Sequence, residues 1–206
     1  MALEHRISEL DTYLFAKGRH YEIYEKMGAH LAEEDGKAGT YFSVWAPNAR
    51  SVSVVGDFNN WDRTAHPMQP VQQSGIWDIF VPGVKAGDLY KFAVETSQGY
   101  TVLKADPYGN QSQLRPDNAS VVADIRYFDW TDQAWRKAHQ EKKTESPMAI
   151  YEVHPGSWKK DPSMPGEFYN FKKLAVELAD YVLEMGYTHV ELIGLSEHPF
   201  DGSWGY

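Results

Sequence analysis

The chain has 206 residues, of which 42% are hydrophobic and 14% aromatic; this is enough for at least one folded core and excludes a disordered acidic tail. Its 20 Lys and Arg and 29 Asp and Glu side chains give a formal net charge of -9, so we expect neither nucleic acid nor an anionic membrane as a partner. It has no cysteine, hence no disulfide or thiol nucleophile, and it has no apolar run suited to a membrane span or secretory signal, which predicts a cytoplasmic protein.

The first segment of the chain is predicted to be a helix that ends near Gly18. Its apolar side chains recur at spacings of four, three and four, at Leu3, Ile7, Leu10 and Leu14. Residues 19–39 carry mixed charge and several glycines, and they end in a polar turn at 33–37. We therefore expect residues 1–39 to be a helix and an irregular lead-in to the first domain.

Short strands separated by Gly, Pro and Asn are expected next along the chain. They are predicted at residues 41–46, 51–55, 76–81, 89–95 and 100–104. Strands of this length, about ten residues apart, are typical of an antiparallel β-sandwich with an immunoglobulin-like architecture. We place this domain at residues 40–125.

The last part of the chain has a different pattern, which predicts a parallel βαβ unit over residues 148–206. A linker at 126–147, with a short helix from Thr131 to Lys137, leads to a strand at 148–153. Asn170 then caps a helix with a strong apolar stripe that ends at Gly186, and a second strand follows at 189–195. A (β/α)8 barrel needs ~250 residues, so we expect an incomplete barrel in a truncated chain.

Four sequence segments carry a resemblance to known families. Residues 41–49 (YFSVWAPNA) and 54–62 (VVGDFNNWD) resemble the glycogen-binding β-sandwich called carbohydrate-binding module family 48. Residues 150–158 (IYEVHPGSW) resemble the first barrel strand of the α-amylase family, glycoside hydrolase family 13. Residues 197–206 (EHPFDGSWGY) are similar to the loop after the second strand in bacterial 1,4-α-glucan branching enzymes. One departure is Pro155, where the pattern has leucine, and this puts the exit of the first strand in doubt.

The resemblance implies a part in glycogen biosynthesis. Members of the family cleave an α-1,4 bond, hold the glucan on an aspartate and pass it to a 6-hydroxyl, a retaining transfer that needs two carboxyl groups about 5–5.5 Å apart. The family places these groups on later barrel strands, so the resemblance assigns no catalytic residue, metal or cofactor to this chain. It implies an α-glucan partner such as glycogen or amylose, and a monomeric parent protein.

Four residues are candidates for substrate binding through the same resemblance. Trp61 and Tyr100 match positions where relatives stack aromatic rings on glucose, and Lys91 matches a sugar-contacting lysine. The alternatives are a Trp that closes one end of the sandwich, a structural Tyr and an outward-facing strand Lys. Tyr206, in the Gly-Tyr pair after the second barrel strand, is expected beneath the sugar at the cleavage subsite of the parent protein.

Other polar residues near the barrel strands are given structural roles. We expect loop scaffolding from Glu197, His198 and Asp201, polar networks inside a barrel from Glu152 and Glu191, and no metal site at His154. Two further hypotheses remain open for the chain as a whole. It is a free-standing glucan-binding module with a vestigial tail, or it is part of a related debranching enzyme or hydrolase.

Overall fold

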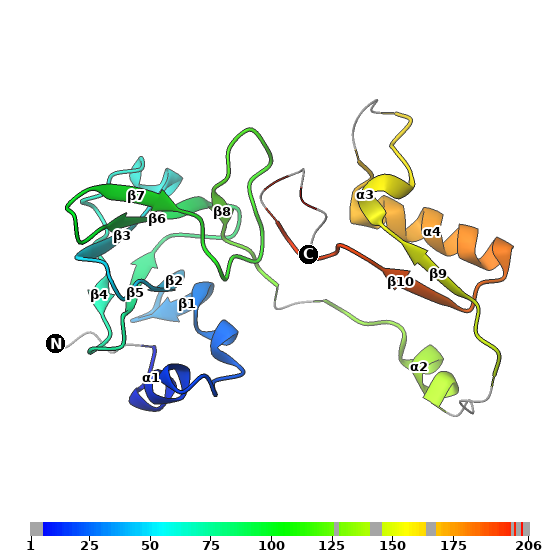
Figure 1. The fold of residues 1–206 in the computed structure, drawn as a ribbon, viewed down its shortest axis with the longest axis horizontal. Helices are drawn as coiled ribbons and strands as arrows, with labels where there is room; N and C mark the ends of the chain where they lie inside the picture. Colours follow the sequence, from blue (N-terminus) through cyan, green and yellow to red (C-terminus); the bar gives the residue numbers. More distant parts are fainter. Residues whose placement is uncertain are drawn as a thin grey trace. The chain divides into compact units, whose positions relative to one another are not determined.

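The computed structural model describes most of the chain, namely residues 6–125, 128–140, 146–163, 168–198, 200 and 203. Contacts divide the chain into two compact units, Met1–Tyr127 and Phe128–Tyr206, and each is described by itself (Figure 1). No helix in these described ranges is long and apolar enough to cross a membrane.

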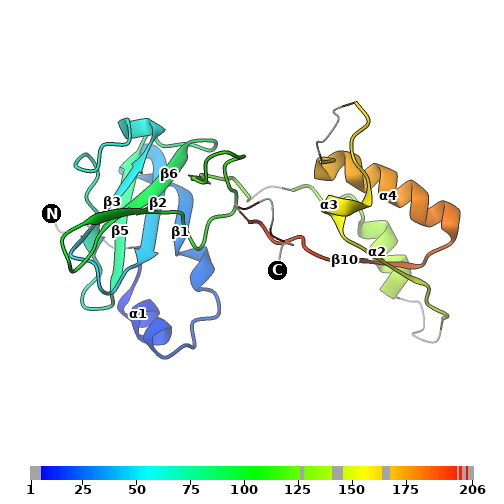
Figure 2. The ribbon, with the colours of Figure 1, turned by 45° about the horizontal axis from the view of Figure 1, so that its top comes forward.

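The first unit is built from two antiparallel sheets. One has the strand order β1 (Gly28–Glu34), β2 (Lys37–Trp45), β5 (Ile76–Pro82) and β4 (Gln69–Pro70). The other places β6 (Leu89–Glu95) between β3 (Ser51–Gly56) on one edge and, on its other edge, β7 (Thr101–Lys104) and β8 (Ser120–Val121). The two sheets face each other as layers (Figure 2), and the predicted β-sandwich is confirmed.

The core of the sandwich lies between the two sheets and is centred on aromatic rings. Phe42 from β2 and Tyr90 from β6 are fully buried, and their ring centroids lie 5.0 Å apart with the edge of one ring toward the other. Phe92 and Phe58 extend this cluster, at 5.8 Å from Tyr90 and 6.0 Å from Phe42 respectively. Burial of such large apolar rings is the main force that holds the two sheets together.

Strand β1 forms where the sequence predicted irregular structure. All seven of its residues pair with β2, from Gly28 opposite Ser43 to Glu34 opposite Lys37. The strand escaped prediction because most of its residues are polar or small, and its stability comes from the partner strand rather than from its own pattern. The tight turn that joins the two strands is Asp35-Gly36, both in the left-handed region that such hairpins require.

Helix α1 covers Glu9–Ala16, which is a later start than the apolar spacing predicted. Ser8 caps the helix, and it exchanges hydrogen bonds with Asp11 in a reciprocal capping box. Ile7 therefore precedes the helix and is buried, whereas Leu10 within it is 64% exposed. The single apolar stripe predicted for this segment was wrong, because the cap sets where the helix begins.

Asp11 also anchors the helix to the chain that follows it. Its carboxylate accepts hydrogen bonds from His20 Nε2, 2.7 Å away, and from Lys26 Nζ. These bonds, together with those from Ser8, outweigh burial and hold the pKa of Asp11 well below its usual range. Leu3, the first residue of the predicted stripe, lies outside the described residues.

A buried carboxylate, Asp106, ties the long segment after β7 to the sandwich core. Its carboxylate accepts hydrogen bonds from the Tyr90 hydroxyl at 2.6 Å and from the Tyr108 backbone N–H at 2.8 Å. Its own backbone N–H donates to Ser120 Oγ at 2.9 Å. Only 8% of the residue is exposed. Burial raises the pKa of Asp106 to about 6, although the hydrogen bonds from Tyr90 and Tyr108 act in the opposite direction.

The second unit has a parallel βαβ core, as predicted. Strands β9 (Ile150–Val153) and β10 (His189–Leu192) pair in parallel, and α4 (Phe171–Met185) connects them. Asn170 caps this helix by accepting the Lys173 N–H, and Gly186 ends it in a left-handed conformation. The linker helix α2 (Gln133–Gln140) begins two residues after the predicted Thr131.

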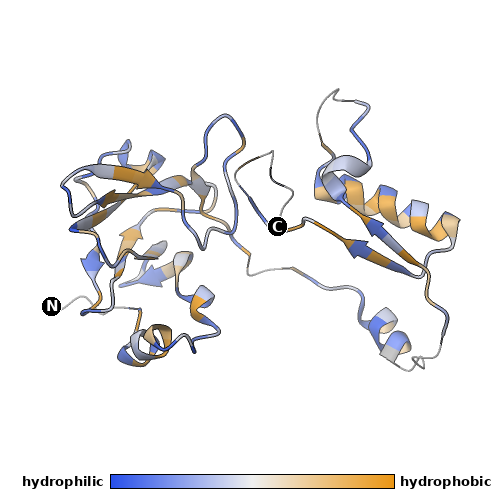
Figure 3. Cartoon of the chain, in the orientation of Figure 1, coloured by the Kyte–Doolittle hydropathy of each residue, from blue (hydrophilic) through white to orange (hydrophobic). Residues whose placement is uncertain are grey.

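Much apolar surface of this second unit is exposed to solvent. Helix α4 buries Leu174 and Leu178, but Leu183 and Met185 of the same helix are 76% and 56% exposed. All four residues of β10 are exposed as well. Figure 3 shows the hydrophobic residues along α4, and the described part of this unit covers only some of them.

We expect Asp106 to make the stability of the first unit depend on pH. Because its folded pKa, about 6, exceeds the value near 3.8 of an unperturbed carboxyl, its ionisation destabilises the fold as pH rises through that window. The Asp106→Asn variant lacks this cost. Relative to the wild type, the variant should gain up to about 3 kcal/mol of unfolding free energy between pH 4 and pH 7. Urea unfolding of both proteins across this range measures it, and a constant difference would contradict the prediction.

Candidate functional site: an outer face of the sandwich and a pocket at the strand ends

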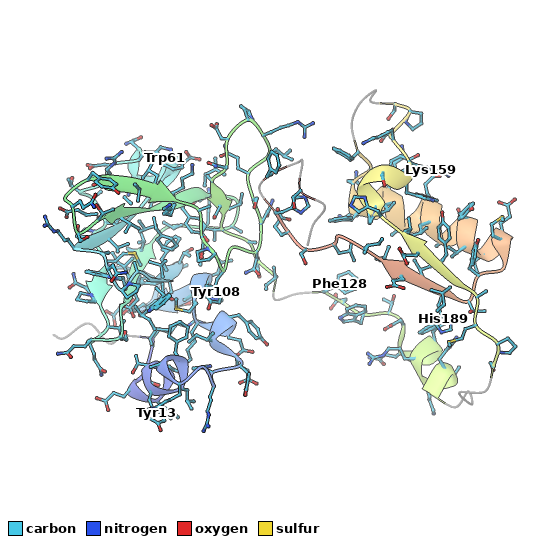
Figure 4. The ribbon with its side chains drawn as sticks, viewed as in Figure 1. Tyr13, Trp61, Tyr108, Phe128, Lys159 and His189 are labelled. Carbon is cyan, nitrogen blue, oxygen red and sulfur yellow. The ribbon has the colours of Figure 1, made fainter. Side chains whose placement is uncertain are left out.

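The turn that carries Trp61 follows β3 and has an unusual backbone. After the 3-10 helix η2 (Asp57–Asn59), both Asn60 and Trp61 have positive φ angles, 52° and 60°. The Trp61 N–H donates to the Gly56 carbonyl at 2.9 Å, and its indole Nε1–H donates to Asp57 Oδ1 at 3.0 Å. The half-buried indole is thereby fixed to its own turn at the margin of the first unit (Figure 4).

A buried side chain, Asn59, holds this turn in place. Its Oδ1 accepts the Gly56 N–H at 2.9 Å, and its Nδ2 donates to the Val54 carbonyl at 3.0 Å. Nδ2 also lies 2.9 Å from Nδ1 of His66. These bonds compensate the strain of two successive left-handed residues, since each alone costs of order 1–3 kcal/mol.

Lys91 lies close to the Trp61 turn because of the strand register. In the β3–β6 pair Val55 is opposite Lys91. The next residue of β3, Gly56, accepts a hydrogen bond from the Trp61 N–H. The Lys91 ammonium donates to Asn118 Oδ1 at 2.6 Å, and Asn118 is exposed on the segment after β7. A cation, an amide and an indole thus share one end of the β3–β6 pair.

Tyr100 lies at the other end of β6 from Lys91. Its carbonyl accepts the Thr96 N–H at 2.9 Å in the turn between β6 and β7, and its side chain is 54% exposed. Thr96 lies five positions along the extended chain from Lys91, which corresponds to roughly 16 Å. The register therefore places Trp61 and Lys91 at one end of the β3–β6 pair and Tyr100 at the other.

A pocket of about 440 Å³ lies at the carboxyl ends of the two parallel strands in the second unit. His154 and Ser157 line it after β9, His198 lines it after β10, and Phe168 and Tyr169 contribute aromatic rings. The carboxyl ends of parallel strands are where α/β folds build their sites.

The unexpected proline after β9 has a local structural role. Pro155 occupies the first turn of a short helix, α3 (Pro155–Trp158), where its missing N–H costs nothing. His154 precedes this helix, with Nδ1 3.2 Å from Ser157 Oγ. The strand ends at Val153, so the proline does not interrupt the pairing with β10.

The two acidic residues of the β9–β10 pair lie within the strands. Glu152 and Glu191 are opposite each other in the β9–β10 register and exposed, at mid-strand rather than at the strand ends. His198 Nδ1 lies 2.8 Å from the Ser196 carbonyl. Asp201 and Tyr206, two predicted loop and site residues, lie outside the described residues. Among the residues that are described, no three His, Asp or Glu side chains gather as a metal site requires.

Comparison with known families identifies the first unit. Residues 26–109 match the family described as carbohydrate-binding module 48 (isoamylase N-terminal domain). The sandwich is a family 48 carbohydrate-binding module. This result confirms the resemblance drawn from residues 41–49 and 54–62.

Nearly the whole chain matches the N-terminal region of 1,4-alpha-glucan branching enzymes. It is 53% identical over 199 residues to the branching enzyme of Protochlamydia amoebophila and 52% identical over 202 residues to that of Butyrivibrio fibrisolvens. The matches cover 96% and 97% of this chain but only 27% and 32% of those relatives.

Solved structures with the same fold include a putative alpha amylase from Salmonella typhimurium. The match has a TM-score of 0.61 at 23% identity, and it covers 88% of this chain and 26% of that one. Another is the catalytic module of the glycogen-degrading pneumococcal virulence factor SpuA, with a TM-score of 0.57 and 24% identity over 85% of this chain and 27% of that one. At these identities the likeness concerns the fold alone.

Asn118 is a residue of the module's outer face that the sequence did not reveal. It lies 27 positions after Lys91, in a segment rich in Pro, Asp and Asn that reads as loop. No spacing or motif indicates the contact, because it depends on how the segment after β7 folds back beside β6. Asn59 lies within the 54–62 motif, but its buried position is also a property of the folded turn.

Replacing Asn59 with alanine should loosen the turn that carries Trp61 in the module. The change leaves the Gly56 N–H without its acceptor and should reduce the unfolding free energy by about 1–3 kcal/mol. In ¹⁵N–¹H spectra the Trp61 indole resonance should shift and broaden, while that of Trp135 in the second unit should not change. An unaltered Trp61 signal would show that Asn59 does not position the ring.

Proposed function

We propose that this chain is part of a glycogen branching enzyme, namely its glucan-binding module and the beginning of its catalytic barrel. The observation that carries the proposal is the sequence identity to branching enzymes, 53% and 52% over 96–97% of the chain. We further propose that the parent enzyme acts in glycogen biosynthesis, as a monomeric, cytoplasmic protein that forms α-1,6 branches by retaining transfer.

The outer face beside Trp61 and Lys91 is the proposed glucan-binding surface of the module. An indole held by Asp57 offers a flat apolar face to a glucose ring, and the ammonium of Lys91 with the amide of Asn118 offers partners for its hydroxyls. Tyr100, from the far end of β6, would contact only a glucan long enough to run along that strand.

The βαβ core is proposed to be the first two strands and the first helix of an α-amylase-type barrel. The parallel register of β9 and β10, the pocket at their carboxyl ends and the apolar surface exposed on α4 and β10 all support this assignment. In the parent enzyme Tyr206 would then lie beneath the sugar at the cleavage subsite.

The chain by itself is proposed to be non-catalytic. Retaining transfer needs a nucleophilic carboxylate and a carboxylic acid that flank one glycosidic bond. Glu152 and Glu191 are unsuited to these roles because they lie at mid-strand, away from the pocket at the strand ends. The acids are therefore expected in the part of the relatives that this chain does not cover.

Affinity electrophoresis in gels that contain glycogen tests the binding surface. The 206-residue chain should be retarded, and Trp61→Ala should abolish most of the retardation because the stacking face is lost. Lys91→Ala should weaken it by a smaller factor, about threefold to tenfold, as expected for a hydrogen bond to a charged group that remains open to solvent.

The matched control for this experiment is Trp130→Ala. Trp130 is 66% exposed in the second unit and lies outside the module. Its loss should leave the retardation unchanged. Equal retardation of the wild type and Trp61→Ala, or no retardation at all, would overturn the proposed surface.

The proposed lack of activity is tested with amylose and iodine. Incubation with the purified chain should leave both the iodine-staining spectrum and the number of reducing ends unchanged. A blue-shifted spectrum without new reducing ends would show branching by this chain, whereas new reducing ends would favour the hydrolase or debranching alternative.

A further inference from the structure

Besides the pocket of the second unit, the first unit has a pocket of its own. It lies on a different side of the module from the Trp61 turn. Its volume is about 370 Å³, enough for one or two sugar rings. The lining comes from the segment before α1, from the 3-10 helix η1 (Ile23–Glu25), from β1 and from two later segments near residues 108–110 and 123–125. β1 is the edge strand of one sheet, while Lys91 lies on the other sheet.

One wall of the pocket is Tyr108, which the fold holds closely against β1. Gly28 has a φ of +94°, and a Cβ at this position would lie 3.0 Å from Tyr108 Cβ and 3.1 Å from its carbonyl oxygen. The Tyr108 N–H is in turn bound to Asp106. The wall is therefore fixed from both sides, and Figure 4 shows Tyr108 beside the β1 region.

Arg6 supplies a cation whose guanidinium is only partly engaged. Its Nη2 donates to the Glu25 carbonyl at 2.9 Å, and its backbone N–H donates to the Tyr41 hydroxyl at 2.6 Å. Its Nη1 is buried and has no hydrogen-bond partner among the residues that the structure describes. Such a donor is costly to leave unsatisfied, so a small side-chain rotation toward a polar ligand would be favourable.

The balance of charges in the pocket favours a neutral ligand. Arg6 shares the lining with two acidic residues, Glu25 and Asp124, and burial lowers the pKa of His30, which favours the neutral form of its ring at pH 7. Charged groups of both signs therefore line the pocket, in contrast to the clustered cations that an anion such as a phosphate requires. Donors and acceptors of several kinds remain around an apolar floor.

Apolar and aromatic groups complete the lining in the way that sugar sites require. Ala29 and Leu31 belong to the floor, and the ring of Tyr24 at the margin is 59% exposed. Sugars present C–H faces to such surfaces and hydroxyl groups to side chains such as Asn110, which also lines the pocket.

We propose that this pocket is a second carbohydrate site of the module, which takes one or two glucose units of an α-glucan. The choice of glucose rests on the proposed function, whereas the neutral, polyhydroxylated character of the ligand follows from the lining. Two sites on one module would hold two segments of a branched glucan and so increase the overall affinity by multivalency.

Titration of the ¹⁵N-labelled 206-residue chain with maltotriose tests the proposal. Saturable shifts are expected for the amides of Ala29, His30 and Asn110, and they should persist in Trp61→Ala. Tyr24→Ala should weaken this binding about tenfold, the loss expected for one stacking ring. Tyr21→Ala is the matched control, because Tyr21 is 85% exposed and outside the lining, and it should bind like the wild type.

The proposal is overturned if no saturable shifts occur at the pocket, if they disappear in Trp61→Ala, or if inorganic phosphate produces them and maltotriose does not. Unchanged binding in Tyr24→Ala would equally contradict the assigned role of the ring. Shifts at Lys91 and Asn118 report the proposed surface separately. Failure there with intact shifts at Ala29 would refute that surface and leave the pocket proposal standing.

Discussion

The hydrogen bond between Tyr90 and Asp106 is the interaction on which the arrangement of the first unit depends. Tyr90 packs its ring against Phe42 of the opposite sheet and donates its hydroxyl proton to a carboxylate that follows β7. The same carboxylate orients Tyr108, and the Asp106 backbone is bound to Ser120. One buried ring thus joins the two sheets to the long segment that helps to build both proposed sugar sites.

Both proposed sites combine a rigid sheet with a segment of irregular structure. On the outer face, β6 supplies Lys91 while the segment after β7 supplies Asn118. In the pocket, β1 supplies the floor and the same segment supplies Tyr108. This arrangement is common in binding proteins, because a rigid sheet holds the connecting segments in place and those segments carry many of the ligand-binding side chains.

The second unit shows that a single βαβ motif buries only part of its own apolar surface. Asn170 and Gly186 cap α4 well, and Leu174 and Leu178 are buried. The remaining apolar positions of α4 and all of β10 stay exposed, since two strands cannot cover a helix of fifteen residues. This surface supports the proposed barrel, in which further strands and helices would cover it.

Local sequence patterns predicted the β-sandwich, the parallel βαβ unit and the resemblance to branching enzymes, because apolar alternation, helix caps and contiguous motifs are local properties. It could not reveal β1, whose polar residues form a strand only through pairing with β2, nor the late start of α1, which the Ser8 cap decides. The contact of Lys91 with Asn118 and the pocket beside Tyr108 join residues distant in sequence, so only the tertiary structure could decide them.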